Sequence, residues 1–269
     1  MNKVIAPYFN KYQAKLDHFI SEFDLTGEQF GKAARNTIKL FDLNQAKVNV
    51  KAFKVPMIIN RIIYGNLRKS KARRSFEFAK RLASLGIKSP KPIAYYEFST
   101  FGLFGKSYYV SEHLACDLTF RELTTDFNYP DHEIILRAFT RFTYNLHQSG
   151  VNFLDHSPGN TLIVKQDSGY DFYLVDLNRM EFKHISLEKR ITNFAKLTTH
   201  KSLIEVMSDE YAKCTGESVK YIYDIMWKST CDFQYKYHRK NVLKNDYFFG
   251  KSKIIEMGFR LILSGFLSI

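Results

Sequence analysis

Cysteine is scarce in this 269-residue chain, and its three cysteines have no spacing typical of a metal site. Cys116, Cys214 and Cys231 are odd in number and widely separated, which argues against a disulfide framework and predicts buried free thiols in a reducing compartment. The sequence also lacks any run of 18 apolar residues that could span a membrane. Its first residues lack the apolar core of a signal peptide, so we expect a cytoplasmic protein.

Negative charge is in short supply. The chain has 40 Lys and Arg against 27 Asp and Glu, which gives a formal net charge of +13. This balance favours an anionic partner such as membrane lipid, a phosphorylated saccharide or nucleic acid. Hydrophobic residues make up 45% of the chain, which excludes a disordered tail, and the length suits one two-lobed domain.

Two acids and one asparagine surround a predicted hairpin in the middle of the chain. Asp155 and Asn160 stand on a short loop, and Asp176 follows an apolar run. Segments 161–165 and 171–175 have the composition of two strands joined by a tight turn. The spacing matches the kinase catalytic loop, where Asp and then Asn are followed, after a hairpin, by a metal-binding Asp.

This set of side chains is what phosphoryl transfer to an alcohol requires. Asp155 would orient or deprotonate the hydroxyl, while oxygens of Asn160 and Asp176 would hold Mg²⁺ on the phosphates of ATP. A surface turn is the structural alternative for this loop, since Asp, Asn, Pro and Gly dominate turns. The acid at the end of the following strand favours the kinase interpretation.

The motifs resemble those of small-molecule kinases. Asp155-His-Ser-Pro-Gly-Asn160 is similar to the Asp-x-His-Pro-Gly-Asn of aminoglycoside phosphotransferases. Asp176-Leu-Asn-Arg179 resembles the Asp-x-x-Arg of the lipopolysaccharide core kinases, which act on Kdo or heptose. The resemblance covers roughly residues 35–185.

The resemblance implies a two-lobed, protein-kinase-like α+β fold. Residues 1–114 would form a small antiparallel-sheet lobe, and residues 115–269 a larger, mainly helical lobe. The implied activity is ATP- and Mg²⁺-dependent phosphorylation of a lipopolysaccharide core saccharide, at the inner face of the cytoplasmic membrane.

The N-terminal half offers candidates for gripping the nucleotide. Strands over 37–43 and 47–54 form a predicted hairpin. Lys51 on its second strand is the candidate for the α and β phosphates, with Lys54 as the alternative. Glu77, on a predicted helix rich in Lys and Arg, would pair with Lys51 as in kinases. A surface pair of Glu77 with Arg81, four residues later on the same helix, is the simpler alternative.

Two further features of this half concern the ends of the nucleotide. The resemblance implies that the backbone of Glu112 and Leu114, where a kinase links its lobes, meets the adenine edge. Residues 26–35 contain two glycines, but not in a G-x-G-x-x-G pattern. This segment would either cover the phosphates of the nucleotide or be an ordinary polar loop.

The chain departs from the protein-kinase pattern at two loop positions. Phe153 stands where protein kinases have His, and Ser157 where they have Lys. The missing Lys agrees with a small-molecule substrate, whereas the missing His removes an anchor of the loop and admits a catalytically silent binding protein.

Basic and apolar segments suggest possible surfaces. Eight Lys or Arg occur in the 21 residues of 61–81, which suits an anionic membrane. Residues 253–269 are apolar with two interrupting charges, which predicts an in-plane amphipathic helix or packing on the larger lobe. Aromatic and basic residues mix over 233–244, so an RNA- or membrane-binding adaptor is an alternative, although no nucleic-acid motif accompanies them.

Overall fold

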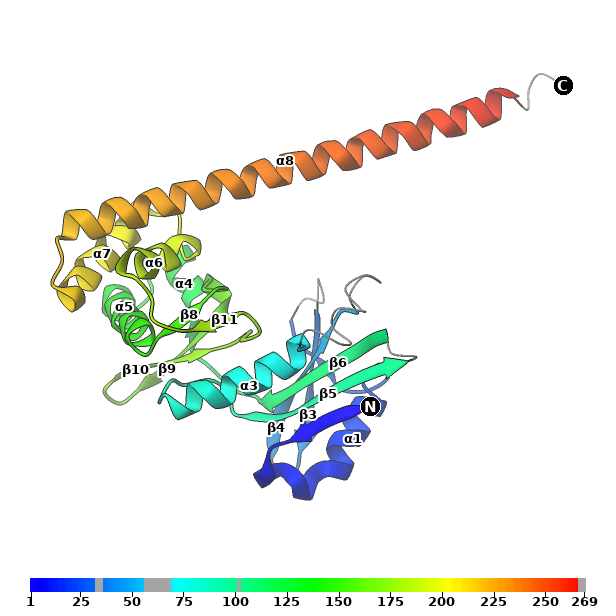
Figure 1. Cartoon of the computed structure of the whole chain (residues 1–269), viewed down its shortest axis with the longest axis horizontal. Helices are drawn as coiled ribbons and strands as arrows, with labels where there is room; N and C mark the ends of the chain where they lie inside the picture. Colours follow the sequence, from blue (N-terminus) through cyan, green and yellow to red (C-terminus); the bar gives the residue numbers. More distant parts are fainter. Residues whose placement is uncertain (32–35, 56–68, 101–102, 266–269) are drawn as a thin grey trace.

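The chain forms two parts, and the computed structural model describes residues 1–31, 36–55, 69–100 and 103–265, with 243–265 described by backbone alone. The first part is a six-stranded antiparallel sheet in the order β1-β5-β6-β4-β3-β2 (Figure 1). Its strands are β1 (Asn2–Ile5), β2 (Glu28–Gln29), β3 (Asn36–Leu43), β4 (Ala46–Phe53), β5 (Pro92–Thr100) and β6 (Leu103–Glu112).

Helices cover both faces of this sheet. The 3₁₀ helix η1 (Pro7–Tyr12) and α1 (Gln13–Ser21) bury aromatic and aliphatic side chains against the face that carries Val50 and Tyr96. On the opposite face, α3 (Lys71–Ser84) packs Phe76 against Tyr95, with ring centroids 5.5 Å apart. Each fully buried large apolar side chain contributes about 1.5–3 kcal/mol to the free energy of unfolding.

The predicted hairpin over 37–43 and 47–54 is confirmed as β3 and β4. Asn44 adopts φ +60° in the turn, a conformation that Asn tolerates better than most residues and that two-residue hairpin turns need. Alternation along β4 then turns Val48 and Val50 toward the core and places Asn49 and Lys51 on the other face.

The second part contains two small sheets and most of the helices. Strands β7 (Leu118–Thr119), β9 (Thr161–Gln166) and β10 (Gly169–Leu174) form one sheet, and β8 (Val151–Phe153) pairs with β11 (Met180–Phe182). The helices are α4 (Phe120–Thr125), α5 (His132–Gln148), α6 (Leu187–Thr192), α7 (Lys201–Thr215) and α8 (Val219–Gly265), with 3₁₀ helices η2 (Pro158–Asn160) and η3 (Asn193–Lys196).

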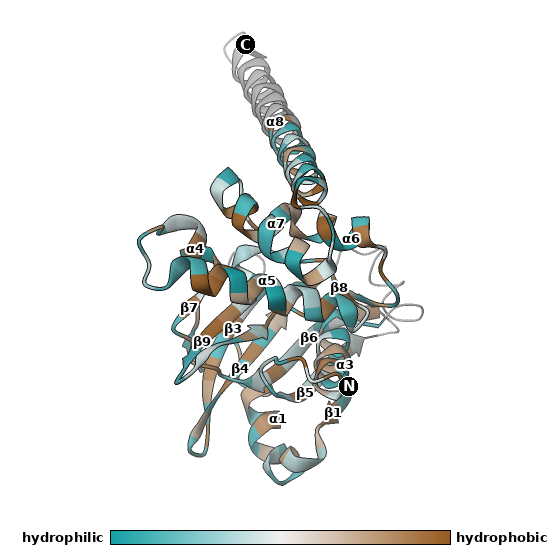
Figure 2. Cartoon of the chain, turned by 90° about the vertical axis from the view of Figure 1, so that its left-hand side faces the viewer, coloured by the Kyte–Doolittle hydropathy of each residue, from teal (hydrophilic) through white to brown (hydrophobic). Residues whose placement is uncertain are grey.

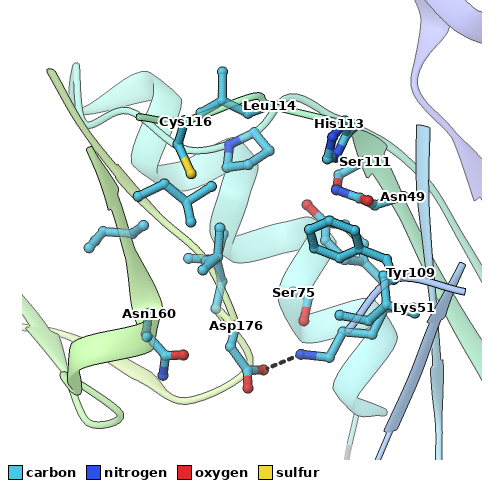
Figure 3. A pocket seen from close by; sticks show the side chains of 18 of the residues that line it. Asn49, Lys51, Ser75, Tyr109, Ser111, His113, Leu114, Cys116, Asn160 and Asp176 are labelled. Atoms are coloured by element: carbon cyan, nitrogen blue, oxygen red, sulfur yellow. Dashed lines mark ion pairs between the residues drawn. The ribbon is translucent and has the colours of Figure 1, made fainter. Parts of the chain in front are cut away.

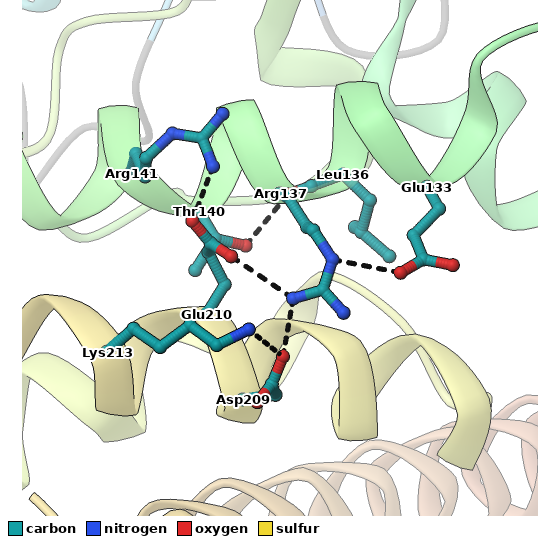
Figure 4. Close-up of polar contacts among 8 residues, drawn as sticks. All are labelled: Glu133, Leu136, Arg137, Thr140, Arg141, Asp209, Glu210 and Lys213. Atoms are coloured by element: carbon teal, nitrogen blue, oxygen red, sulfur yellow. Dashed lines mark hydrogen bonds and ion pairs between the residues drawn. The ribbon is translucent and has the colours of Figure 1, made fainter.

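An ion-pair network joins α5 to α7 (Figure 4). Arg137 reaches Glu210 at 3.1 Å and Asp209 at 2.5 Å, and Arg141 also pairs with Glu210, which is only 9% exposed. Burial opposes ionisation of Glu210, but its hydrogen bonds from the two arginines outweigh burial and hold its pKa below the ordinary value. Both helices carry hydrophobic and hydrophilic stretches, as expected for helices with one buried face (Figure 2).

The predicted α+β fold is confirmed, since an antiparallel sheet part adjoins a mainly helical part. The expectation of buried thiols is wrong for two cysteines: Cys116 lies exposed after β6, and Cys231 lies exposed on α8. Within the ranges that the structure describes, none of the helices combines the length and apolar character needed to cross a bilayer. Side chains of 253–269, for which we predict an amphipathic helix, lie outside the described residues.

Candidate active site

A cavity of about 440 Å³ lies between the sheet and the second part of the chain (Figure 3). This volume falls within the range usual for ligand pockets. One wall comes from β3, β4 and β6 and the other from β9, β10 and the segment after β10. Residues on the two walls include Ile38, Asn49, Lys51, Tyr109 and Ser111, facing Asn160, Leu162, Leu174, Val175 and Asp176.

Lys51 projects from β4 into this cavity. Its Nζ lies 2.8 Å from Oδ1 of Asp176, so the strand lysine and the acid after β10 meet although 125 residues separate them in sequence (176 − 51). The lysine side chain is 16% exposed, which strengthens the attraction relative to a surface pair. Lys54, the alternative, lies exposed beyond the end of β4.

The expected ion pair between Lys51 and Glu77 is not what the structure shows. Glu77 accepts hydrogen bonds from Lys69 at 2.7 Å and from Arg73 at 2.9 Å. The cause is local: Arg73 and Glu77 both lie within α3, four residues apart, so their side chains share one face of the helix. Burial raises the pKa of Glu77, but these two hydrogen bonds outweigh it and keep the pKa below its ordinary value.

The loop after β8 places Asp155 beside Asn160. Nδ2 of Asn160 donates to the backbone carbonyl of Asp155 at 2.8 Å, and the carbonyl of Asn160 accepts from the N–H of Val175 at 3.0 Å. The pairing of β8 with β11 brings the two loops together, and Leu154 N–H donates to the Arg179 carbonyl. Asn160 and Asp176 both line the cavity, while Asp155 is linked to them through Asn160.

Two basic side chains from elsewhere in the chain approach the Asp155 carboxylate. Arg179 lies 3.0 Å from Oδ1, and the ammonium of Lys196 lies 3.6 Å from the same oxygen. Glu181 stands only two residues from Arg179 in the sequence, but the two side chains have different partners. Glu181 instead pairs with Lys189 at 2.8 Å, and Arg179 serves Asp155.

Asp176 adopts a left-handed backbone, with φ +58°. Such a conformation costs a non-glycine residue about 1–3 kcal/mol and persists where its surroundings hold it. Here Nδ2 of Asn178 donates to Asp176 Oδ1 at 2.6 Å, and Lys51 approaches the same oxygen. Asn178, which stands where protein kinases have Gly, therefore supports the acid directly.

Residues 31–216 match the model of the lipopolysaccharide kinase (Kdo/WaaP) family. The chain belongs to this family. The predicted enzyme class, a phosphotransferase that acts on a sugar hydroxyl, is thereby confirmed.

A solved structure of WaaP in complex with acyl carrier protein is similar to this chain. It aligns with a TM-score of 0.60 and 17% identity, over 89% of this chain and 99% of that one. At this identity the likeness concerns the fold. No curated protein matches the chain.

The loop that carries Asp155 in this Kdo/WaaP-family chain has an anchor that the sequence did not reveal. Asn193 of η3 donates from Nδ2 to the carbonyl of Phe153 at 2.9 Å and to Oδ1 of Asn152 at 3.2 Å. Its own Oδ1 lies 3.1 Å from Nδ1 of His156 and 3.2 Å from Nε2 of His147. Because an amide oxygen only accepts, these two ring nitrogens carry the protons.

Both histidines are buried and neutral. Burial lowers the pKa of His147 to about 4 and that of His156 to about 3, although each hydrogen bond to Asn193 opposes the shift. His147 Nδ1 is left as the acceptor for the hydroxyl of Tyr211, at 2.9 Å. Neutral rings therefore fix the loop without adding charge next to Asp155.

The other end of the cavity carries unpartnered polar atoms. Among the described residues, Oδ1 of Asn49 and Nδ1 of His113 are buried without a hydrogen-bond partner, and both residues line the cavity. Phe30 packs edge-on against His113, with centroids 5.4 Å apart, and also lines the cavity. Leu114 lines it as well, whereas the Glu112 side chain lies 3.8 Å from Lys91. A backbone contact from Glu112 and Leu114 to adenine stays a prediction.

The oxygen donors of Asn160 and Asp176 suit Mg²⁺. The amide of Asn160 and the carboxylate of Asp176 supply hard oxygen atoms from opposite sides of one loop junction. Mg²⁺ at kinase sites usually takes one or two protein oxygens together with phosphate oxygens and water. The residues present therefore fit the ion, and the described residues contain no larger cluster of acids, histidines and cysteines. Lys32 and Arg35 of the expected phosphate-covering segment lie outside the described residues.

Proposed function

We propose that the chain transfers the γ-phosphoryl group of ATP to a hydroxyl of Kdo or heptose in the lipopolysaccharide core. One observation carries this proposal: Lys51 meets Asp176 at the end of the cavity where Asn160 binds the backbone of Asp155. Phosphoryl transfer uses this grouping, with a lysine and metal ligands on the phosphates and a carboxylate on the nucleophile. We take residues 1–114 and 115–269 as the two lobes around the cavity.

Asp155 acts on the acceptor hydroxyl in this proposal. Arg179 and Lys196 both approach Oδ1, which leaves Oδ2 to accept the hydroxyl proton. The hydroxyl oxygen forms a bond to the γ-phosphorus, and the bond from that phosphorus to the β–γ bridging oxygen breaks. Its electron pair stays with ADP, and the proton passes to the Asp155 carboxylate.

Asn160 and Asp176 would hold Mg²⁺, which neutralises charge on the β and γ phosphates when bound. Lys51 binds the α and β phosphates from the sheet side. Its ammonium, already directed at Asp176, has three donors and can contact the acid and a phosphate oxygen together.

Adenine occupies the end of the cavity near Asn49. The buried Oδ1 of Asn49 is an acceptor that lacks a donor among the described residues, and the adenine amino group is a donor. Guanine presents a carbonyl at the equivalent position, so the same atom disfavours GTP. The ring of Phe30 would cover the base.

The decisive experiment measures ATP turnover with purified Kdo-containing and heptose-containing lipid acceptors. Asp155→Asn and Asp176→Asn should each lose at least about 100-fold in kcat, since each removes a carboxylate from the reaction. The matched control is Asp167→Asn, the same charge change in the exposed β9–β10 turn. Equal turnover in all four proteins would eliminate the mechanism.

We also propose attachment to the inner membrane face. The support is the net charge of +13 and the basic helix α3, because each Lys or Arg near an anionic surface contributes about 1 kcal/mol. Part of the basic run, residues 61–68, lies outside the described residues. Cosedimentation with vesicles that contain anionic lipid, and none with neutral vesicles, is the expected result.

A further inference from the structure

Lys196 brings a positive charge to a loop position where the local sequence supplies none. Protein kinases carry a lysine two residues after the catalytic Asp, but this chain has Ser157 there. Lys196 comes from η3, 41 residues after Asp155 (196 − 155), and its Nζ lies 3.6 Å from Oδ1 of that acid. The same ammonium donates to the backbone carbonyl of Leu154.

We propose that Lys196 is a further catalytic residue, whose ammonium contacts the phosphoryl group during its transfer. The proposal rests on the proposed function, because it places the reacting hydroxyl at Asp155. A hydroxyl within about 3 Å of that carboxylate brings the γ-phosphorus close to the Lys196 ammonium. Cations fixed at the place where phosphoryl charge develops are a major source of catalysis.

The donor inventory separates Lys196 from the other cations near Asp155. An ammonium has three donors, and Lys196 uses one on Leu154 and directs another toward Asp155 at a long 3.6 Å. One donor therefore remains for a phosphoryl oxygen. Arg179 lies closer, at 3.0 Å, and is 55% exposed, which suits a guanidinium that orients the carboxylate. Lys51 belongs to Asp176 on the other side of the site.

The position of Lys196 is fixed by the same short helix that anchors the loop. Residues three apart in a 3₁₀ helix lie on one face, and Asn193 and Lys196 have this spacing in η3. Asn193 binds the carbonyl of Phe153, and Lys196 binds the carbonyl of Leu154, so one turn of helix holds two successive loop carbonyls. The Lys196 side chain is 31% exposed, which leaves its tip access to substrate.

No proton leaves Lys196 in this step. The bonds formed and broken are those of the transfer already described, and the hydroxyl proton still goes to Asp155. The ammonium remains charged throughout and acts only on the charge of the transferred group. Replacing Lys196 by a neutral side chain of similar length should therefore preserve the fold and lower kcat.

Lys196→Gln is the central test, because glutamine keeps a donor for the Leu154 carbonyl and removes the charge. We expect kcat to fall by about 100- to 1,000-fold, the usual effect of removing one such donor, while KM for ATP stays within about threefold. Lys196→Arg should recover at least tenfold of that loss. Lys189→Met, which removes the partner of Glu181, is the control and should keep wild-type kcat.

Three measurements decide between catalysis and loop support. Wild-type kcat in Lys196→Gln overturns the proposal. A fall in kcat with a matching rise in KM for ATP, or with an unfolding temperature lowered by more than about 5 °C, also overturns it, since a purely supporting lysine would act that way. Asp155→Asn separates the two ideas: if that variant keeps full activity, the proposed function itself fails.

Discussion

Moving from pH 7.5 to pH 5 should destabilise the chain strongly through two buried histidines, His147 and His156, at the loop that carries Asp155. His147 is 1% exposed and His156 is fully buried, and burial lowers their pKa values to about 4 and about 3 from an ordinary 6.5. In the unfolded chain both rings gain protons as the pH falls below 6.5, while in the folded chain they stay neutral. Their contribution to stability is therefore complete above pH 6.5 and is lost as the pH falls toward 4.

The magnitude follows from the pH interval. Each pH unit between the unfolded and folded pKa values removes about 1.4 kcal/mol per histidine. From 6.5 to 5 this amounts to about 2 kcal/mol for each ring and about 4 kcal/mol for both. A loss of this size is a large part of the 5–15 kcal/mol typical of a folded domain, so the effect is measurable.

Urea unfolding at pH 7.5 and pH 5 measures this free energy. Replacing His156 by Asn removes one titrating ring and should reduce the pH-dependent loss by about 2 kcal/mol. The control is His184→Asn, which removes an exposed histidine and should leave the loss unchanged. Two results would refute the assignment of buried neutral rings. One is an equal unfolding free energy at the two pH values in the wild-type chain, and the other is an equal loss of unfolding free energy between pH 7.5 and pH 5 in the two variants.

Other predictions concern the cavity and the α5–α7 network. Lys51→Met should lower kcat/KM for ATP by at least about 100-fold, whereas Glu77→Gln should change it by less than about threefold, because its carboxylate serves Lys69 and Arg73; steady-state kinetics decides. Asn49→Leu should weaken ATP binding about 5- to 10-fold and reduce the preference over GTP, as titration calorimetry would detect. Glu210→Ala should lower the free energy of unfolding by about 1–3 kcal/mol in urea, since two arginines lose their buried partner.

Local patterns were sufficient for most of the fold. The alternation over 37–54 predicted β3 and β4, and the composition of 161–165 and 171–175 predicted β9 and β10. The alternation also put Lys51 on the face opposite Val48 and Val50, as the structure confirms, although the predicted strand wrongly included Lys54, which lies beyond the end of β4. These features depend on neighbours in the sequence, which is why sequence alone reached them.

Pairings between distant segments could not be obtained in this way. The partner of Glu77 depends on how α3 is rotated: the sequence suggested Lys51 or Arg81, whereas the structure pairs Glu77 with Lys69 and Arg73. The cavity end at Asn49 gave no signal either, because a lone Asn on a strand has many ordinary explanations. The unpartnered Oδ1 of Asn49 and Nδ1 of His113 indicate a binding site only because the structure places both residues in the cavity wall.

Phe153, which stands where protein kinases have the loop histidine, has a different implication in the structure than in the sequence. In the sequence, Phe153 in place of His admits an inactive protein, because an anchor of the catalytic loop is lost. In the structure Phe153 is fully buried, and its carbonyl is held by Asn193, whose amide also binds two neutral histidines. An amide with all four hydrogen bonds made is a rigid support, so the loop keeps its shape without the motif residue. Phe153 therefore gives no reason to expect an inactive site. Asn193→Leu should lower kcat in this chain, as loss of the loop histidine would in a protein kinase, because the loop loses its support.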